Sequence, residues 1–254
     1  MGTVGLGRLT TAMKILILGG TAEARELANR LVGLEHEVIT SLAGRTQDPI
    51  LPQGGLRMGR FGGIPGLAAY LRAAGIDRLV DATHPYAGQM SINAVAAAQA
   101  INLPLVRYMR PAWLAEPGDN WILVETPAEA AASLPPNADV LLTTGHMGLE
   151  HFLERDDCQF VVRLIETPTL DIPNHAKLLQ TRPPYALADE VALMKREGIT
   201  HLVTKNSGGA QTAAKLSAAR QLGVKVIMIA RPVYGPALEV ASVDDAISAM
   251  ALTG

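Results

Sequence analysis

Short apolar runs rich in Val, Ile and Leu alternate along the chain with longer Ala- and Leu-rich stretches of helical spacing. This alternation of two periods is typical of βαβ units, in which helices join parallel strands. Helices are expected to begin near Ala22, Gly63 and Ala87. Strands are predicted over 14–18, 36–42, 55–59, 77–82 and 104–108, and in the second half over 121–125, 139–144, 159–164, 176–180, 201–205 and 225–230. The pattern predicts an α/β fold with mainly parallel sheets.

A proline-containing polar stretch at 109–120 (MRPAWLAEPGDN) interrupts this alternation and suits a linker between two domains. A weak internal repeat agrees with the division, because residues 96–111 align without gaps on residues 217–232. Both copies end on Arg-Pro, and an aromatic residue, Trp113 or Tyr234, follows each. The chain is therefore expected to contain two similar halves.

Two Rossmann-like domains are predicted, over 13–112 and 121–254. Open parallel sheets bind ligands at the carboxyl ends of their strands, so two such domains would form an active-site cleft between them. Residues 1–12 lack the continuous apolar core of a secretory signal, and we treat them as a loose leader with Met13 as an alternative start.

Composition narrows the class of protein. With 48% hydrophobic residues among 254, the chain has ample material for globular cores. The single cysteine, Cys158, excludes a disulfide framework and a cysteine-based zinc site, which favours the reducing cytoplasm. No metal is expected, since His146 and His151 are five residues apart and lack an obvious third ligand. No apolar run is long enough to cross a bilayer, so we expect no membrane partner.

Charge is distributed unevenly along the chain. The net charge of -2 argues against nucleic-acid binding. Residues 1–112 nevertheless carry 11 Lys and Arg against 7 Asp and Glu, whereas residues 113–254 carry 11 against 17. A locally positive cleft for an anionic ligand would explain this difference, and so would ordinary drift of surface charge.

Gly19, Gly20 and Thr21 form a turn between a buried strand and a helix. Free N–H groups at such a turn, including that of Ala22, and the positive end of the helix suit the phosphates of a dinucleotide. The spacing matches Gly-x-Gly-x-x-Gly/Ala only in part: counted from Gly19, the second glycine is replaced by Thr21, and the third position is the permitted Ala24. The Thr21 hydroxyl is expected to contact a phosphate oxygen. A plain strand-to-helix turn is the alternative.

The stretch ITSLAGRT (39–46) ends the second strand, where NAD-preferring sites place an acid for the ribose 2′-hydroxyl. It contains no acid. Ser41, Arg45 and Thr46 are instead expected to hold a 2′-phosphate, with Arg45 as its bidentate partner. This reading predicts NADPH as the cofactor, and an ordinary surface arginine at position 45 is the alternative.

Six motifs occur in order between Ile15 and Gly209: ILILGGTAEAR, TSLAGRT, RFGGIPGLAAYL, DATHPYA, RPAW and TKNSGG. In this order the chain resembles the precorrin-6A reductases of cobalamin biosynthesis, including the cobalt-precorrin branch. The resemblance implies a two-domain oxidoreductase that uses a nicotinamide cofactor to reduce one ring double bond of precorrin-6A, a tetrapyrrole, giving precorrin-6B. It leaves open whether the substrate contains cobalt and whether neighbouring pathway enzymes exchange substrate or product with this one.

The stretch DATHPYA (81–87) would then lie at the carboxyl edge of the first sheet, beside the dinucleotide. Asp81 and Thr83 are expected to contact the cofactor. His84 and Tyr86 are candidate catalytic residues, which would orient the reacting ring or donate a proton. Pro85 ends the strand and stiffens the turn. In the alternative reading Asp81 caps the turn and His84 is a structural histidine.

The second half offers a matching edge at VTKNSGG (203–209). Lys205 lies at the end of a strand and is a candidate proton donor or carboxylate partner. The two glycines that follow would leave backbone N–H groups available to bind an anion. A water molecule is an equally good proton donor. For the arginines among the further expected substrate contacts a solvated surface position is the alternative, and for Thr144 and Gly145 it is simple packing. These further contacts are Asn206, Ser207, Gly208, Thr144, Gly145, Arg107, Arg110, Arg182 and Arg231.

Other classes of protein share single features with this chain. A short-chain dehydrogenase would need Tyr-x-x-x-Lys, and no tyrosine of the chain has a lysine four residues later. A non-catalytic NADP-sensing protein, an NADH-dependent cobalt-precorrin-6A reductase and a two-domain glycosyltransferase stay open. Melting temperatures with NADPH, NADH and a nucleotide sugar would separate them.

Overall fold

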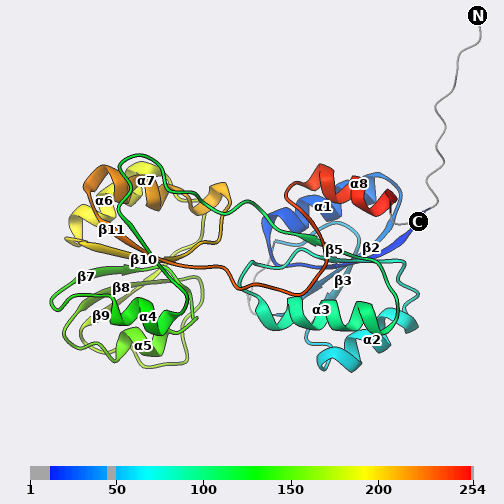
Figure 1. Ribbon diagram of the computed structural model, residues 1–254, viewed down its shortest axis with the longest axis horizontal. Coiled ribbons are helices and arrows are strands. Elements are labelled where there is room, and N and C mark those ends of the chain that lie inside the picture. Colours follow the sequence, from blue (N-terminus) through cyan, green and yellow to red (C-terminus); the bar gives the residue numbers. More distant parts are fainter. Residues whose placement is uncertain (1–11, 45–49, 253–254) are drawn as a thin grey trace, which may run out of the picture. The chain divides into compact units, whose positions relative to one another are not determined.

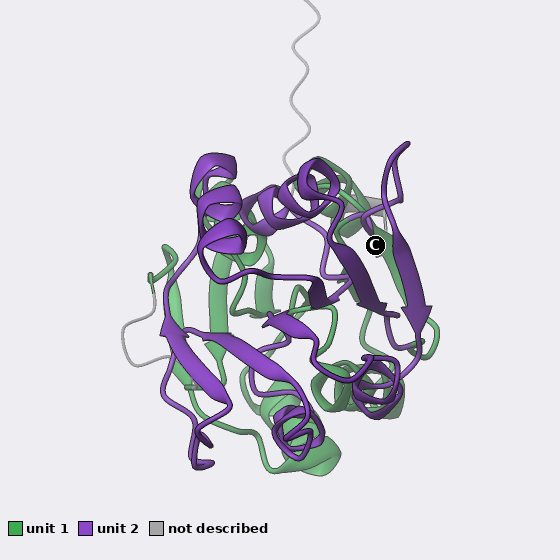
Figure 2. Ribbon diagram, turned by 90° about the vertical axis from the view of Figure 1, so that its left-hand side faces the viewer, with its two compact units in different colours: residues 1–110, 233–254 green, residues 111–232 purple. Residues whose placement is uncertain are grey.

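The computed structural model describes residues 12–44 and 50–252 and divides into two compact units, coloured separately in Figure 2. Unit 1 contains the described residues up to Arg110 and those from Val233 onward, and unit 2 is Pro111–Pro232. Each unit is built on one six-stranded sheet in which every strand pair is parallel. The predicted α/β class with two parallel sheets is confirmed.

Unit 1 has helices on both faces of its sheet, whose strand order is β12-β5-β4-β1-β2-β3. The helices α1 and α8 cover one face, and α2 and α3 cover the other (Figure 1). Because both faces are covered, β1 is a continuous apolar run with Ile15, Leu16 and Ile17 fully buried. Its elements are β1 (Lys14–Leu18), α1 (Ala22–Gly33), β2 (Glu37–Leu42), β3 (Gly55–Met58), α2 (Gly63–Ala73), β4 (Arg78–Asp81), α3 (Gly88–Ala100), β5 (Leu105–Tyr108), β12 (Leu238–Val240) and α8 (Val243–Leu252).

Unit 2 repeats this plan with the strand order β6-β11-β10-β7-β8-β9. The helices α6 and α7 lie on one face of the sheet, and the shorter α4 and α5 lie on the other (Figure 1). Its elements are β6 (Trp121–Val124), α4 (Pro127–Ala132), β7 (Asp139–Leu142), α5 (Leu149–Leu153), β8 (Gln159–Leu164), β9 (Ala176–Gln180), α6 (Leu187–Arg196), β10 (His201–Lys205), a 3-10 turn (Ala210–Thr212), α7 (Ala214–Leu222) and β11 (Lys225–Ile229).

The domain limits differ from the expected 13–112 and 121–254 at the C-terminal end. After Pro232 the chain returns to unit 1, where β12 pairs with β5 and α8 packs against α1. All eleven predicted strands are present within two residues of their expected ends, whereas β12 was not predicted. A strand of three residues has no measurable period, and its place depends on the edge that β5 leaves open.

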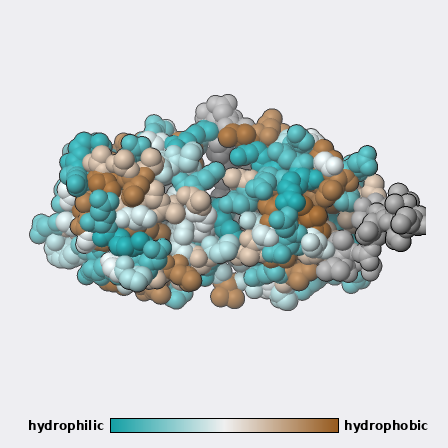
Figure 3. All heavy atoms as spheres, turned by 90° about the horizontal axis from the view of Figure 1, so that it is seen from above, coloured by the Kyte–Doolittle hydropathy of each residue, from teal (hydrophilic) through white to brown (hydrophobic). Residues whose placement is uncertain are grey.

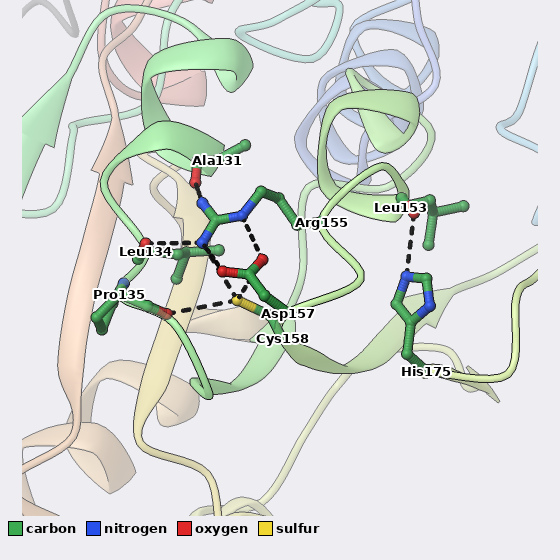
Figure 4. Close-up of polar contacts among 8 residues, drawn as sticks. All are labelled: Ala131, Leu134, Pro135, Leu153, Arg155, Asp157, Cys158 and His175. Carbon is green, nitrogen blue, oxygen red and sulfur yellow. Dashed lines mark hydrogen bonds and ion pairs between the residues drawn. The ribbon is translucent and has the colours of Figure 1, made fainter.

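Cys158 is a packing residue in unit 2. It is fully buried, and burial raises the pKa of its thiol, which keeps it protonated. Arg155 organises the surrounding loops, because its guanidinium donates to the carbonyls of Ala131 (2.6 Å) and Leu134 (3.0 Å) and to Asp157 (Figure 4). The cysteine therefore contributes to the core rather than to chemistry.

The surface shows scattered apolar groups. Hydrophilic and hydrophobic side chains are interspersed over the face seen in Figure 3. Leu114 and Val233 are among the most exposed apolar residues, and both lie near the two connections between the units. None of the helices in the described part of the chain is long and apolar enough to span a membrane. Single exposed apolar residues of this kind are usual on protein surfaces.

Candidate functional site

A shallow pocket lies at the carboxyl edge of the sheet of unit 1. The strands β1, β4 and β5 are neighbours there, so the segments that follow them meet. The pocket brings together the predicted residues Thr21, Thr83 and Arg110. It is lined by Thr21, Glu23, Thr83, Pro85, Tyr108 and Arg110.

The turn after β1 needs its two glycines for different reasons. The Gly19 N–H donates to the Ser41 carbonyl (2.9 Å), and a Cβ atom at Gly19 would lie 2.8 Å from the Thr40 methyl group. Gly20 has a φ of +109°, with no atom within 4 Å of a Cβ placed there. The turn is therefore tight against β2 on one side and open on the other, as a close approach of backbone and ligand requires.

Thr21 is the N-cap of α1. Its hydroxyl accepts from the Ala24 N–H (3.0 Å) and donates to the Ala82 carbonyl (3.0 Å). The cap satisfies one of the N–H groups of the first turn, and the second bond ties this turn to the end of β4. Since the only hydroxyl proton points at Ala82, a phosphate here would bind backbone N–H groups such as that of Ala22 rather than the Thr21 hydroxyl.

The expected 2′-phosphate pocket is described only in part. Ser41 lies at the end of β2 and is buried, and its carbonyl holds Gly19. Arg45 and Thr46 lie outside the described residues. The NADPH preference that was predicted from them stays a prediction.

Asp81 is buried with 2% of its surface exposed and shapes the turn that follows β4. Its Oδ1 accepts from both the N–H (3.2 Å) and the hydroxyl (2.7 Å) of Thr83. Its Oδ2 lies 3.6 Å from Nε of Arg107, which is 1% exposed. The Asp81 carboxylate therefore fixes the orientation of Thr83. Of Asp81 and Thr83, it is Thr83 that lines the pocket.

The burial of Arg107 corrects the expectation that it holds a substrate carboxylate. Its guanidinium donates to the Gly235 carbonyl (3.0 Å) and to Glu239 of β12 (2.8 Å). The reason is the returning C-terminal segment, which covers β5 and which sequence patterns did not reveal.

His84 is partly exposed and its tautomer is set by the turn. The Tyr86 N–H donates to Nδ1 of His84 (3.2 Å), and the Ala87 N–H donates to the His84 carbonyl (2.7 Å). An Nδ1 atom that accepts a hydrogen bond has no proton, so the neutral ring has its proton on Nε2. The two rings of His84 and Tyr86 lie 5.9 Å apart. This arrangement favours a hydrogen-bond donor at Nε2.

Two groups in the pocket were missed by sequence reasoning. Glu23, in the first turn of α1, accepts from Arg110 (3.0 Å), so Arg110 pairs with the start of α1 within unit 1. Burial and then the charge of Glu23 raise the pKa of Tyr108, whose phenol keeps its proton as a donor. The sequence did hold a signal for Glu23 at the pocket, because this residue comes only two positions after the predicted turn.

In unit 2 the turns after β7 and β10 meet, because these strands are paired. Thr144 is completely buried, and Gly145 has a φ of +66°. The ammonium Nζ of Lys205 would lie 3.9 Å from a Cβ atom at Gly145. The structure thus places the Lys205 ammonium beside Gly145, whereas Thr144 is buried.

The loop after Lys205 is held by the segment that enters unit 2. Both ends of the Asn206 amide bind the backbone of Trp113, at 2.8 and 3.0 Å. Arg231 Nε donates to the Asn206 carbonyl (2.7 Å), and the Ser207 N–H donates to the Lys205 carbonyl (2.7 Å). These bonds give Asn206 and Arg231 a role in shaping the loop after Lys205.

Gly208 is required by packing. It has a φ of +66°, and a Cβ atom there would lie 2.1 Å from the Pro111 carbonyl oxygen and 2.6 Å from the Arg231 guanidinium. The crossing chain, rather than a ligand, accounts for Gly208.

Arg182 is another basic residue that was expected at the substrate. It pairs with Glu166 (2.9 Å).

A buried ion pair supports the same end of the sheet of unit 2. Arg163, near the end of β8, binds Glu190 of α6 through two bonds of 2.8 and 3.0 Å. The guanidinium also lies 4.3 Å from the ring centre of Tyr185. Only the position of an arginine inside an apolar strand signalled this pair in the sequence.

Comparison with known proteins gives concordant results. A family model described as precorrin-6x reductase CbiJ/CobK matches residues 14–251. Precorrin-6A reductase of Rhodococcus erythropolis is 48% identical over 243 residues, which are 95% of this chain and 97% of the relative. Precorrin-6A reductase of Sinorhizobium sp is 42% identical over 249 residues, 95% of each chain. The solved structure of CobK precorrin-6A reductase is 38% identical, with a TM-score of 0.90 over 95% of this chain and 97% of that chain.

Proposed function

The chain belongs to the precorrin-6x reductase CbiJ/CobK family, and from this premise we propose that it reduces one ring double bond of precorrin-6A with NADPH, giving precorrin-6B in cobalamin biosynthesis. The observation that carries the proposal is the match along nearly the whole chain to relatives named precorrin-6A reductase. The family resemblance seen in the sequence is confirmed.

The residues of unit 1 fit a dinucleotide. Gly20 leaves open space beside the turn, and the first-turn N–H groups of the twelve-residue helix α1 are directed to the same edge. Arg110 neutralises Glu23, which would otherwise repel a phosphate at this helix end. When bound there, the nicotinamide cofactor supplies the hydride. Arg45 is proposed to select NADPH by pairing with the 2′-phosphate.

His84 is proposed to orient the reacting ring rather than to act as the acid. An imidazole whose Nδ1 accepts from the Tyr86 N–H has Nε2 as its donor, and protonating Nδ1 would break the bond from Tyr86. A neutral imidazole is a poor proton donor, which leaves Lys205, Tyr86 or a water molecule to protonate the carbon next to the one that receives hydride. Most of the catalysis then comes from holding the two rings in reactive geometry.

Lys205 is proposed to bind a carboxylate of the tetrapyrrole. The family's substrate has acetate and propionate side chains, and the ammonium group stands over the small Gly145 at the carboxyl edge of the sheet of unit 2. A bound anion would favour the ammonium form and fix the orientation of the macrocycle. We place the reaction in the cytoplasm, where the single cysteine stays reduced.

The direct test is turnover by the purified protein with precorrin-6A and either NADPH or NADH. We expect cofactor oxidation with NADPH and a product heavier than the substrate by two hydrogens. A rise in melting temperature with NADPH but no product would support the NADP-sensing alternative instead. Equal rates with NADH and NADPH would contradict the assignment of Arg45 while leaving the reductase intact.

A further inference from the structure

The sequence repeat Arg-Pro-x-aromatic marks the two connections between the units. It occurs at 110–113 and at 231–234, and the unit boundaries fall inside both copies, after Arg110 and after Pro232. Apart from Arg110, which neutralises Glu23, the function proposed above gives this repeat no role. We propose that the two segments are positioning elements, which hold the ligand-facing turns of both units in shape through Tyr234 and Trp113. The inference rests on the proposed function, because it concerns the turns that carry His84 and Lys205.

The first segment binds a turn on each side of its crossing. Arg110 donates to both carboxylate oxygens of Glu23 (3.0 and 3.1 Å) in unit 1, which the chain is leaving. Trp113 binds in unit 2, which the chain is entering. Its N–H and carbonyl pair with the Asn206 amide, and its indole Nε1 donates to the Gly209 carbonyl (3.2 Å). The loop after Lys205 is thereby fixed at two points.

The second segment repeats this order in the reverse direction. Arg231 donates to the carbonyls of Asn206 (2.7 Å) and Pro111 (3.2 Å) in unit 2, which the chain is now leaving. The hydroxyl of Tyr234 donates to the Pro85 carbonyl (2.5 Å) in unit 1. In both copies the arginine binds in the unit that is left, and the aromatic residue binds a turn of the unit that is entered.

The Tyr234 bond acts on the turn of His84. Pro85 follows His84 directly, and the His84 carbonyl accepts from the Ala87 N–H (2.7 Å) in the same turn. The Tyr234 ring itself is held by the buried Arg107, whose guanidinium lies 5.3 Å from the ring centre and also binds the Gly235 carbonyl. A rigid support therefore fixes the peptide next to the imidazole. Tyr234 and Arg107 contribute geometry and are not themselves expected to touch a reacting atom.

Tyr234→Phe tests the inference because it removes one hydroxyl and keeps the ring. Loss of one hydrogen bond should raise amide exchange across 84–88 by about threefold to tenfold. kcat should fall by about tenfold as His84 loses its orientation, while NADPH affinity changes by less than about twofold. Tyr70→Phe is the matched control, since Tyr70 lies on α2 and packs against Phe61, away from this turn. It should alter neither exchange nor kcat.

Trp113→Phe provides the reciprocal measurement, because it removes the indole donor to Gly209. Exchange should rise across 205–209 and not across 84–88, and the KM for precorrin-6A should rise by about threefold or more. Unchanged exchange at 84–88 in Tyr234→Phe, measured well below its melting temperature, would overturn the positioning role. Exchange does not depend on turnover, so a wild-type protein without reductase activity would refute the proposed function and still decide this inference.

Discussion

The two units share one topology but differ at the turn after their first inner strand. In each sheet the five consecutive strands have the same relative order, and a sixth strand is added beside the fifth. In unit 1 the added strand is β12, from the segment after the second crossing, whereas in unit 2 it is β6, from the segment after the first. After β1 the chain forms the twelve-residue helix α1, capped by Thr21. After β7 it forms only the five-residue α5.

This difference decides which unit suits a dinucleotide. The unpaired N–H groups of a helix lie in its first turn, but the helix dipole behind them grows over several turns, and α1 begins directly after Gly20 and Thr21. In unit 2, Gly145 and Gly148 both have positive φ, and the helix that follows is too short to add much charge at its start. The same topology thus places a long helix capped by Thr21 after the first inner strand of one copy and a short helix after a glycine-containing turn in the other.

The largest expected effect separates the glycines of the two units. Gly208→Ala in unit 2 should lower the free energy of unfolding by about 3 kcal/mol or more, because its Cβ would collide with the Pro111 carbonyl. Gly20→Ala in unit 1 meets no atom and should cost about 1 to 2 kcal/mol of backbone strain. Urea unfolding of the two variants checks this order. Equal losses would mean that the loop of unit 2 relaxes around the added methyl group.

The next effect concerns His84. His84→Ala should lower turnover by about a hundredfold while sparing NADPH binding, since an orienting donor is lost. His84→Gln keeps an N–H donor and should recover most of this loss if His84 orients the ring. Steady-state kinetics with His151→Ala as control checks it. Glutamine as inactive as alanine would restore the proton-donor role, and normal turnover of His84→Ala while folded would make it a structural histidine.

Cofactor choice should depend on unit 1 alone. Arg45→Ala should weaken NADPH by about tenfold to a hundredfold, the loss of one charge-assisted contact, and leave NADH almost unchanged. Calorimetric titration with both cofactors measures the difference, and Arg182→Ala in unit 2 is the control. Equal losses for NADPH and NADH would remove Arg45 from the 2′-phosphate.

Substrate binding should respond to unit 2. Lys205→Met should weaken precorrin-6A by about tenfold at low salt and by less at high salt, because an exposed ion pair is screened. NADPH affinity should not change. A loss of NADPH affinity with none for precorrin-6A would reverse the assignment of the two units.

The smallest effect is on pH-dependent stability. Burial alone would raise the pKa of Asp119, but hydrogen bonds from Arg220 and the Glu116 N–H outweigh it and hold the pKa below its ordinary 3.8. Its contribution is therefore present above pH 3.8 and lost as pH falls through the lower folded-state value. Asp119→Asn should cost about 1 kcal/mol near neutral pH and nothing at the acid end.

The repeat at 96–111 and 217–232 shows how far sequence reasoning reached. The two stretches fall on α3 with β5 and on α7 with β11, the fifth strand of each sheet. The strands β5 and β11 coincide with predicted strands and α3 begins beside the predicted helix start at Ala87, whereas no helix start was predicted for α7. Sequence reasoning also placed Thr21, Thr83 and Lys205 at strand ends, where the structure has them. It did not find that Arg107 is covered or that Asn206 and Gly208 hold a crossing chain, because those contacts join residues about 93 to 132 positions apart.

What the sequence determined by itself was local: eleven strands, the strand-to-helix turn at Gly19 to Thr21, the proline-stiffened turn at His84 and the motifs of the reductase family. Each depends on the chemistry of neighbouring residues, which the order of amino acids states directly. The tertiary structure alone decided that β12 and β6 exchange places between the halves, that Tyr234 supports the His84 turn and that Glu23 meets Arg110. Those pairings depend on which edge strand of a sheet is unpaired when a later segment of the chain returns to it. The pattern of residues along the chain does not state which strand is at the edge.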